Sequence, residues 1–305
     1  MEDPSETTLD SGRAGGRHRT AKKKNLALPA ILVILGMLVM LYPVVSTMLN
    51  NYATTKAAKE YAQLEKSVPQ EVKDTQWEDA QRYNAERTQG PLLDPWLDQI
   101  DESNPDYASY LEKLNATDAM ARLIIPSIKV DLPIYHGTSD ETLQKGLGHL
   151  YGSDLPVGGE GTHAIITGHT GLTNATLFDR LSDVKENDVF YVQVSGHKLK
   201  YQVDQIKVVL PTETDDLKVQ EGKDLITMIT CTPYGINTHR LLVRGHRVEM
   251  DPSEEAIFDQ TQSPGMQWWM YALIALVILI ALGLLWWLRK ARSVVKPQEG
   301  EAHEN

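Results

Sequence analysis

Residues 229–235 read ITCTPYG, and three residues later residues 239–245 read HRLLVRG. Each run is apolar and rich in β-branched residues, and a Pro-Tyr-Gly turn closes the first, which predicts two strands joined as a hairpin. Such a hairpin could return Arg240 beside Cys231, the only cysteine among 305 residues. A lone cysteine has no intramolecular disulfide to form. Cys231 is therefore either a small buried hydrophobic residue or a reactive thiol.

The same strand pattern extends back along the chain to Ala121. A period of two with β-branched residues predicts strands, and Ser195-Gly196 predicts a hairpin turn between two of them. The expected strands are 122–125, 130–135, 163–167, 188–194, 197–210, 225–230 and 240–248. Many short strands with few helices between them favour a mainly antiparallel barrel or sandwich.

The chain before the strands has a helical pattern. Residues 51–89 place apolar and small residues on one face, and Pro69 divides the stretch into two helices. Gly-Pro and Asp-Pro pairs in residues 90–97 predict a loop. Residues 106–114 are expected to add a short helix. After the strands, residues 251–265 have the composition of a polar linker.

Two segments are long and apolar enough to cross a bilayer. Residues 26–49 and 266–288 carry no charge, and each exceeds the ~20 residues that a hydrocarbon core requires. Paired tryptophans lie near both ends of the second segment, where interfacial aromatic rings are expected. A cleaved signal peptide is the alternative for the first segment. Its apolar core is longer than a usual h-region and no clear A-x-A site follows, which favours an uncleaved anchor.

The charges beside these segments predict their orientation. Lys and Arg precede the first in the tail 1–25 and follow the second in the tail 289–305. Both termini should therefore face the cytoplasm, with everything between the two spans outside. Residues 50–266 hold 20 Lys and Arg against 34 Asp and Glu, a net charge of −14. That balance argues against nucleic acid as a partner, because phosphate binding needs a basic face.

A thiol becomes a good nucleophile beside a base or a positive charge. Residues 165–172 read IITGHTGL and place His169 at the end of a predicted strand, where a scaffold can hold an accessible group. His169 and Arg240 are thus the candidate partners of Cys231. Each has a plainer interpretation: a packed core cysteine, a turn histidine, and an arginine that pairs with a carboxylate.

The block around the cysteine resembles a family signature. Residues 226–235 (ITMITCTPYG) with 237–241 (NTHRL) resemble the TLxTC-and-Arg signature of sortases, the membrane-bound cysteine transpeptidases of Gram-positive bacteria. The longer form, through LLVRG at 241–245, is similar to the class C branch, which assembles pili. Met228 stands where the family usually has Leu, a conservative apolar change.

Three further features match that class over about residues 50–290. Gly168 to Leu172 with Leu177-Phe178 is similar to the family's histidine block, although Thr170 replaces the usual arginine. Asp94-Pro95-Trp96 resembles the lid motif over the active site; its plainer interpretation is an Asx-Pro turn that packs a tryptophan. Two membrane anchors also match class C, because many other sortases have only the N-terminal one.

The resemblance implies a fold and an arrangement along the chain. The expected fold is mainly β: a sortase-type eight-stranded β-barrel with N-terminal helices and a lid loop, flanked by two transmembrane helices. The expected segments are 1–25 tail, 26–49 span, 50–118 helices and lid, 119–250 barrel, 251–265 linker, 266–288 span and 289–305 tail.

It also implies a chemistry. Cys231 would be the nucleophile, His169 the general acid and base, and Arg240 the donor to substrate or oxyanion, while Asp94 would bind Arg240 and Trp96 would cover Cys231. This chemistry needs no cofactor or metal, and the acidic residues show no compact ligand spacing.

The implied reaction cleaves an LPXTG-like sorting signal between Thr and Gly and joins pilin subunits through an acceptor lysine. Two alternatives stay open. One is a housekeeping sortase that attaches surface proteins to lipid II, and the other is a membrane-anchored scaffold without activity.

Overall fold

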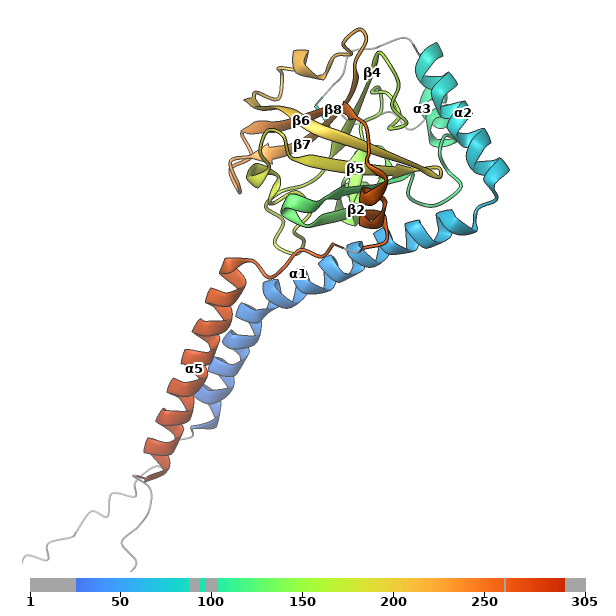
Figure 1. Cartoon of the computed structure of the whole chain (residues 1–305). Helices are drawn as coiled ribbons and strands as arrows, with labels where there is room; N and C mark the ends of the chain where they lie inside the picture. The colour runs from blue at the N-terminus through green and yellow to red at the C-terminus, as the bar shows by residue number, and fades with distance from the viewer. Residues whose placement is uncertain (1–25, 88–93, 97–103, 261, 294–305) are drawn as a thin grey trace, which may run out of the picture. The chain divides into compact units, whose positions relative to one another are not determined.

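A computed structural model describes residues 26–87, 94–96, 104–260 and 262–293 (Figure 1). The chain divides into two compact units, one of Met1–Val39 with Val277–Asn305 and the other of Met40–Leu276. The expected tail 1–25, most of the tail 289–305, and the chain on both sides of the expected lid tripeptide lie outside the described residues.

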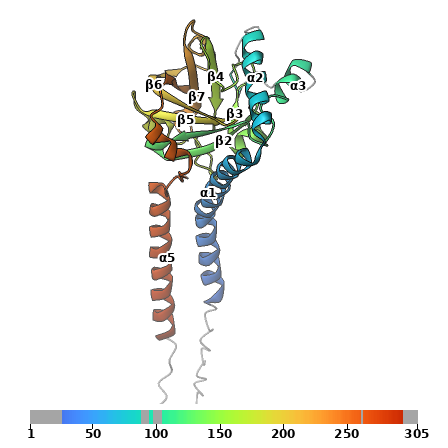
Figure 2. The same ribbon diagram turned by 45° about the vertical axis from the view of Figure 1, so that its right-hand side comes forward.

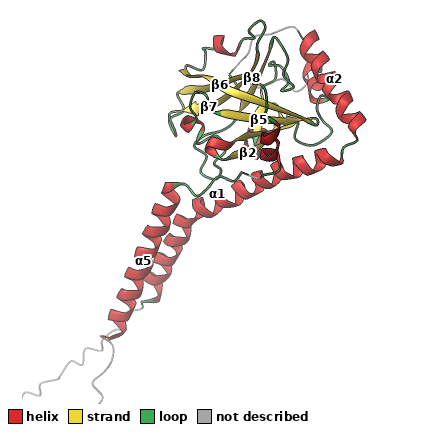
Figure 3. Cartoon of the chain, in the orientation of Figure 1, coloured by secondary structure: helices red, strands yellow, loops and turns green. Residues whose placement is uncertain are grey.

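The second unit is built on a closed β-barrel, which confirms the predicted fold class (Figure 3). The strand order around the barrel is β1-β2-β3-β4-β7-β8-β6-β5. The strands are β1 (Ala121–Ile125), β2 (Val130–His136), β3 (Leu147–His149), β4 (Thr162–Thr167), β5 (Val189–Val194), β6 (His197–Val209), β7 (Asp224–Thr232) and β8 (His239–Val248). Pairing is antiparallel except between β2 and β3 and between β4 and β7.

The strand predictions agree with the barrel apart from one omission. All seven predicted strands are present within two residues at each end, and β3 was missed. Its three residues, of which the middle one is Gly148, are too few for a period of two to be visible. The predicted turn is also present: Ser195 and Gly196 have φ of 47° and 82°, as a two-residue hairpin with the twist of its strands requires.

The N-terminal helices differ from the prediction at one boundary. Helix α1 (Ala27–Ser67) runs without a break past residue 49, because no glycine or proline follows there before Pro69. Its later turns pack on the barrel through the buried residues Ala58, Tyr61 and Glu65. Helix α2 (Gln70–Glu86) begins after Pro69 as predicted, and the short helix α3 (Pro105–Leu111) follows it in the chain (Figure 2). The Asn104 side chain caps α3, because it accepts a hydrogen bond from the Asp106 amide.

The predicted polar linker after the barrel is a docked segment, which corrects the sequence interpretation. A short 3-10 helix (Pro252–Phe258) begins at a capping box made by Asp251 and Glu254, and buries Phe258. Phe258 packs against Ile124 and Tyr191. The Asp-x-x-Glu spacing was the available signal for this helix. Helix α5 (Trp268–Ser293) then contains the second apolar segment.

Candidate active site

The β7–β8 hairpin brings two of the candidate residues together. The register pairs Cys231 of β7 with Arg240 of β8. Directly opposed residues of an antiparallel pair point to the same face, with Cβ atoms about 5 Å apart. His239 precedes Arg240 and therefore points to the other face, so the histidine nearest in sequence is not the one that shares a face with the thiol.

Strand β4 carries the third candidate to the same end of the barrel. It runs parallel to β7, with Thr167 opposite Ile229, so that His169 and Cys231 each lie two residues beyond that pair. Beyond the ladder, the Gly168 amide donates to the Ile229 carbonyl at 3.1 Å, and Thr230 Oγ1 donates to the Gly168 carbonyl at 2.7 Å. These bonds continue the sheet to the residue before the histidine.

Gly168 leaves no space for a side chain at this point. A Cβ would lie 2.6 Å from Phe178 Cδ2 and 2.7 Å from Leu147 Cδ2, closer than carbon atoms pack. The Phe178 amide also donates to the His169 carbonyl at 3.0 Å. The glycine and the phenylalanine of the sequence block thus hold the backbone of the histidine in place.

The tripeptide Asp94-Pro95-Trp96 lies on this end of the barrel. Arg240 donates from Nε to Asp94 Oδ2 at 2.6 Å and from Nη2 to Asp94 Oδ1 at 2.9 Å, a bidentate pair. The side chains of Arg240 and Asp94 are 7% and 4% exposed. Asp94 Oδ1 also accepts from the Trp96 amide at 3.0 Å, which fixes the turn of the tripeptide.

The Trp96 ring contacts two of the candidate catalytic residues. The Arg240 guanidinium carbon lies 4.8 Å from the ring centroid, within the range of a cation–π contact. Trp96 Nε1 donates to His169 Nδ1 at 3.4 Å. An indole N–H only donates, so Nδ1 must accept, which makes His169 neutral with its proton on Nε2. The ring also packs against a buried apolar cluster: Leu150, Ile165, Leu217, Ile229 and Leu242.

The pKa shifts favour the uncharged forms of both the Cys231 thiol and the His169 imidazole in the closed site. Burial raises the pKa of the Cys231 thiol, Arg240 lowers it, and the carboxylate of Asp94 raises it again. Burial lowers the pKa of His169. The thiol is therefore protonated and the imidazole neutral while Asp94 occupies Arg240.

Another barrel histidine, His149, is bound into a structural network. His149 is fully buried, and burial lowers its pKa to about 3. It contacts the Tyr110 hydroxyl at 2.9 Å and the Asp154 carbonyl at 2.7 Å. Arg87 donates to Asp154 Oδ1 at 3.0 Å. Arg87 and Tyr110 lie on either side of the tripeptide in sequence, so one network fastens both chain segments that lead to it. No sequence pattern signals this network, because its members are distant along the chain.

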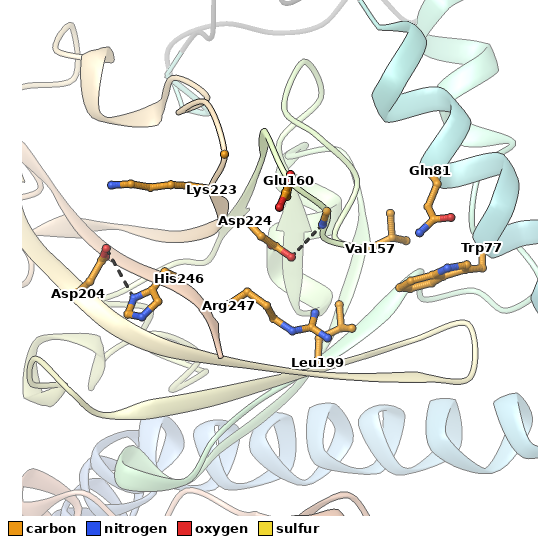
Figure 4. A pocket seen from close by; sticks show the side chains of 12 residues that line it. Trp77, Gln81, Val157, Glu160, Leu199, Asp204, Lys223, Asp224, His246 and Arg247 are labelled. Carbon is orange, nitrogen blue, oxygen red and sulfur yellow. Dashed lines mark hydrogen bonds and ion pairs between the residues drawn. The ribbon is translucent and has the colours of Figure 1, made fainter. Parts of the chain in front are cut away.

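A separate pocket of about 800 Å³ lies at the other end of β7 (Figure 4). Its lining includes Trp77, Asp224 and Arg247, and none of the predicted site residues. Asp224 begins β7 and Cys231 lies seven residues along it, which separates their backbones by about 23 Å. Among the described residues, no group of three or more His, Cys, Asp or Glu side chains could hold a metal ion.

Comparison with known proteins gives consistent relatives. A family model described as the sortase domain matches residues 123–248. The structure of sortase C-1 from Actinomyces oris is 52% identical and covers 59% of this chain and 99% of its own, with a TM-score of 0.58. Sortase A from Corynebacterium diphtheriae is 49% identical (68% and 95% covered, TM-score 0.60). Sortase C from Streptococcus pneumoniae is 40% identical (64% and 97% covered, TM-score 0.58).

Proposed function

The chain belongs to the sortase family of cysteine transpeptidases, and we propose that it joins pilin subunits through lysine isopeptide bonds. The observation that carries the proposal is the bidentate closure of Asp94 on Arg240, with Trp96 over the same site. The Streptococcus pneumoniae relative is described in terms of pilin substrate specificity, and a related sortase C of Group B Streptococcus as pilus-related. A lid mutant is known for the Corynebacterium diphtheriae sortase A.

In the proposed first step, the thiol of Cys231 gives its proton to His169, and its sulfur attacks the threonine carbonyl carbon of an LPXTG-like signal. The electron pair of the carbonyl moves to its oxygen, and the Arg240 guanidinium donates hydrogen bonds to that oxyanion. When the intermediate collapses, the Thr–Gly bond breaks and His169 gives its proton to the departing glycine amine. The product is a thioester between Cys231 and the threonine.

In the second step, the amine of an acceptor lysine attacks the thioester. His169 now takes a proton from that amine, and the bond to Cys231 breaks to release the thiolate. The threonine is left in an amide bond to the lysine side chain. The enzyme is regenerated when the His169 imidazolium returns its proton to the Cys231 thiolate.

The closed arrangement has to change before either step. Asp94 occupies Nε and Nη2 of Arg240, two donors that an oxyanion would need, and Trp96 occupies Nδ1 of His169. Removal of the carboxylate would also remove one cause that raises the pKa of Cys231. We therefore expect the lid to control both access and the charge state of the thiol.

The proposed topology has two membrane spans. Helices α1 and α5 each contain an 18-residue apolar window, of which 6% and 0% is buried, so neither window is a core helix of the barrel. The 26 residues of α5 extend about 39 Å, enough for a hydrocarbon core of roughly 30 Å. Because Lys and Arg precede the first apolar segment and follow the second, the termini would be cytoplasmic and the barrel extracellular.

Family membership sets aside the alternative of an inactive scaffold. The housekeeping alternative keeps the first step and changes the acceptor to lipid II. The lid tripeptide and the second apolar helix favour the pilin acceptor, because the resemblance associates both features with class C.

The test replaces Cys231 with Ala in the native host, in a strain without another pilin-polymerising sortase. High-mass pilin ladders should disappear from cell-wall extracts and return when the wild-type gene is supplied. Persistent ladders would contradict the proposal. Mass spectrometry of the joined product then identifies the acceptor: a pilin lysine supports pilus assembly, and a lipid II peptide supports the housekeeping alternative.

A further inference from the structure

The loop that follows His169 is closed by a single carboxylate. Asp179 Oδ1 accepts from the Gly171 amide at 2.8 Å and from Thr170 Oγ1 at 3.2 Å. These are the first two residues after the histidine. Gly171 has φ of 76°, a left-handed conformation that glycine adopts without strain. Asp179, at the far end of the loop, thus binds both of the residues that follow His169.

The other oxygen of this carboxylate is bound to the segment that enters α5. Gln267 Nε2 donates to Asp179 Oδ2 at 3.0 Å. Gln267 immediately precedes Trp268, the first residue of α5. The side-chain oxygen of Gln267 accepts from Trp269 Nε1 at 2.6 Å. Both the nitrogen and the oxygen of the side-chain amide are thus bonded, which fixes its orientation.

Helix α1 also binds this loop. Asn51 Nδ2 donates to Thr176 Oγ1 at 2.8 Å, and the Thr176 amide donates to Asn51 Oδ1 at 3.0 Å. Gln267 Nε2 is also 3.3 Å from Thr176 Oγ1. The loop between His169 and Asp179 is therefore held by a residue within α1 and by the residue that immediately precedes α5.

The contacts of Asp179 make its position sensitive to each donor. The carboxylate is partly buried, and burial raises its pKa while the bonds from Gln267, Gly171 and Thr170 lower it. Its observed donors are an amide, a backbone N–H and a hydroxyl, none of which carries a charge. A partly buried carboxylate that loses one such donor has a desolvation cost that is no longer fully offset, so the loop would rearrange.

We propose that Asp179 is a positioning residue for His169, and that Gln267 positions Asp179. The segment entering the C-terminal apolar helix would thereby take part in holding the histidine of the active site. This inference rests on the proposed role of His169, but it concerns the placement of the ring and can be measured without any substrate.

The test exchanges the donor and the acceptor of the pair. In Gln267→Glu two carboxylates face each other, and in Asp179→Asn two amides do. The double variant with both changes restores one acceptor and one donor and keeps the net charge. All variants are made in the full chain, in detergent micelles or nanodiscs, so that α5 stays attached.

The first readout is the titration of the His169 ring, followed by its ¹³Cε1–¹H signal and assigned with His169→Gln. Each single variant should loosen the loop and admit water to a ring whose pKa burial now lowers. Its midpoint should therefore rise by roughly half a unit. The double variant should return it to the wild-type value.

The second readout is cleavage of a fluorogenic LPXTG peptide. A misplaced general acid should lower kcat by about tenfold in each single variant with little change in KM, and the double variant should recover most of it. Gln260→Glu is the matched control, since it adds the same charge to the same segment while Gln260 contacts Arg122 through its backbone carbonyl. It should behave as the wild type.

Two outcomes would overturn the inference. One is an unchanged His169 titration in both single variants when they are folded. The other is a double variant no better than the worse single one, which decides the matter even where a single variant folds poorly. If the peptide is not cleaved by any form, the proposed function has failed, and the ring titration still reports on the positioning.

Discussion

Two buried arginine–aspartate pairs in this protein have nearly the same geometry. Arg122 donates to Asp131 at 2.6 Å and 2.7 Å, and Arg240 donates to Asp94 at 2.6 Å and 2.9 Å. Both are bidentate, and all four side chains are at most 7% exposed. Contact geometry and burial alone would therefore assign the two pairs the same role.

The two pairs differ in the parts of the chain to which their residues belong. Arg122 and Asp131 lie nine residues apart on the adjacent strands β1 and β2. Arg122 also donates to the Gln193 side chain at 3.2 Å and to the Phe258 carbonyl at 2.8 Å. Asp94 lies 146 residues from Arg240, and its departure would break no strand pairing. A buried arginine–aspartate pair stabilises the fold when both residues belong to the barrel. When one residue lies outside the barrel, as Asp94 does, the pair can act as a latch, meaning an ion pair that holds the lid tripeptide closed and can open.

The largest expected effect is on stability, from Asp131→Ala. It leaves the Arg122 guanidinium buried without its carboxylate, which typically costs about 3–5 kcal/mol. Asp94→Ala should cost far less, because Asp94 belongs to no strand of the barrel and the shortened side chain would let water reach Arg240. Urea unfolding of the full chain in micelles measures both. Asp183→Ala, which removes an exposed pair with Arg180, is the control and should change little. Equal losses of unfolding free energy in Asp131→Ala and Asp94→Ala would contradict the distinction between a structural pair and a lid pair.

The next effect is on catalysis, from Arg240→Lys. A lysine keeps the charge but cannot present two fixed donors, so turnover of an LPXTG peptide should fall by about 100-fold. Asp94→Ala is included in both proteins compared, so that the latch does not limit the rate. Arg247→Lys, in the pocket at the other end of β7, is the matched control. A loss of less than threefold would remove Arg240 from the proposed mechanism.

A smaller effect is expected on the reactivity of the thiol. Asp94→Ala or Trp96→Ala should raise the rate of iodoacetamide labelling by about tenfold, which corresponds to a latch worth about 1.4 kcal/mol. Cys231 is the only cysteine, so labelling of the full chain reports this site alone. Trp77→Ala, which removes a tryptophan stacked on His197, should leave the rate unchanged. Equal rates in all forms would contradict a cover over the cysteine.

The smallest effect is on the pH dependence of that labelling. Asp94 raises the pKa of Cys231 and Arg240 lowers it, so loss of the carboxylate should shift the midpoint toward lower pH. We expect a shift of roughly half a unit to one unit. Asp94→Asn should shift it in the same direction, because it removes the charge while keeping an acceptor for Arg240. A midpoint that stays in place or rises would show that Asp94 does not act on the thiol through its charge.

The sequence determined the features that depend on neighbours along the chain. Period-two stretches predicted seven of the eight strands, and Ser195-Gly196 predicted its hairpin, because strand faces and turn conformations are local properties. The β7–β8 hairpin let Arg240 be placed beside Cys231 for the same reason. The position of His169 at the end of a predicted strand made it a candidate, and the family resemblance supplied its role and added the lid tripeptide.

Only the tertiary structure decided which distant groups meet. The β4–β7 pairing is parallel and brings His169 to Cys231 from more than sixty residues away, and no local pattern encodes such a register. The bonds from Asn51 and Gln267 to the histidine loop likewise join residues 125 and 91 positions from Thr176. Local stereochemistry acts over a few residues, whereas these contacts exist only once the barrel has closed and the segments that carry Asn51 and Gln267 have packed against it.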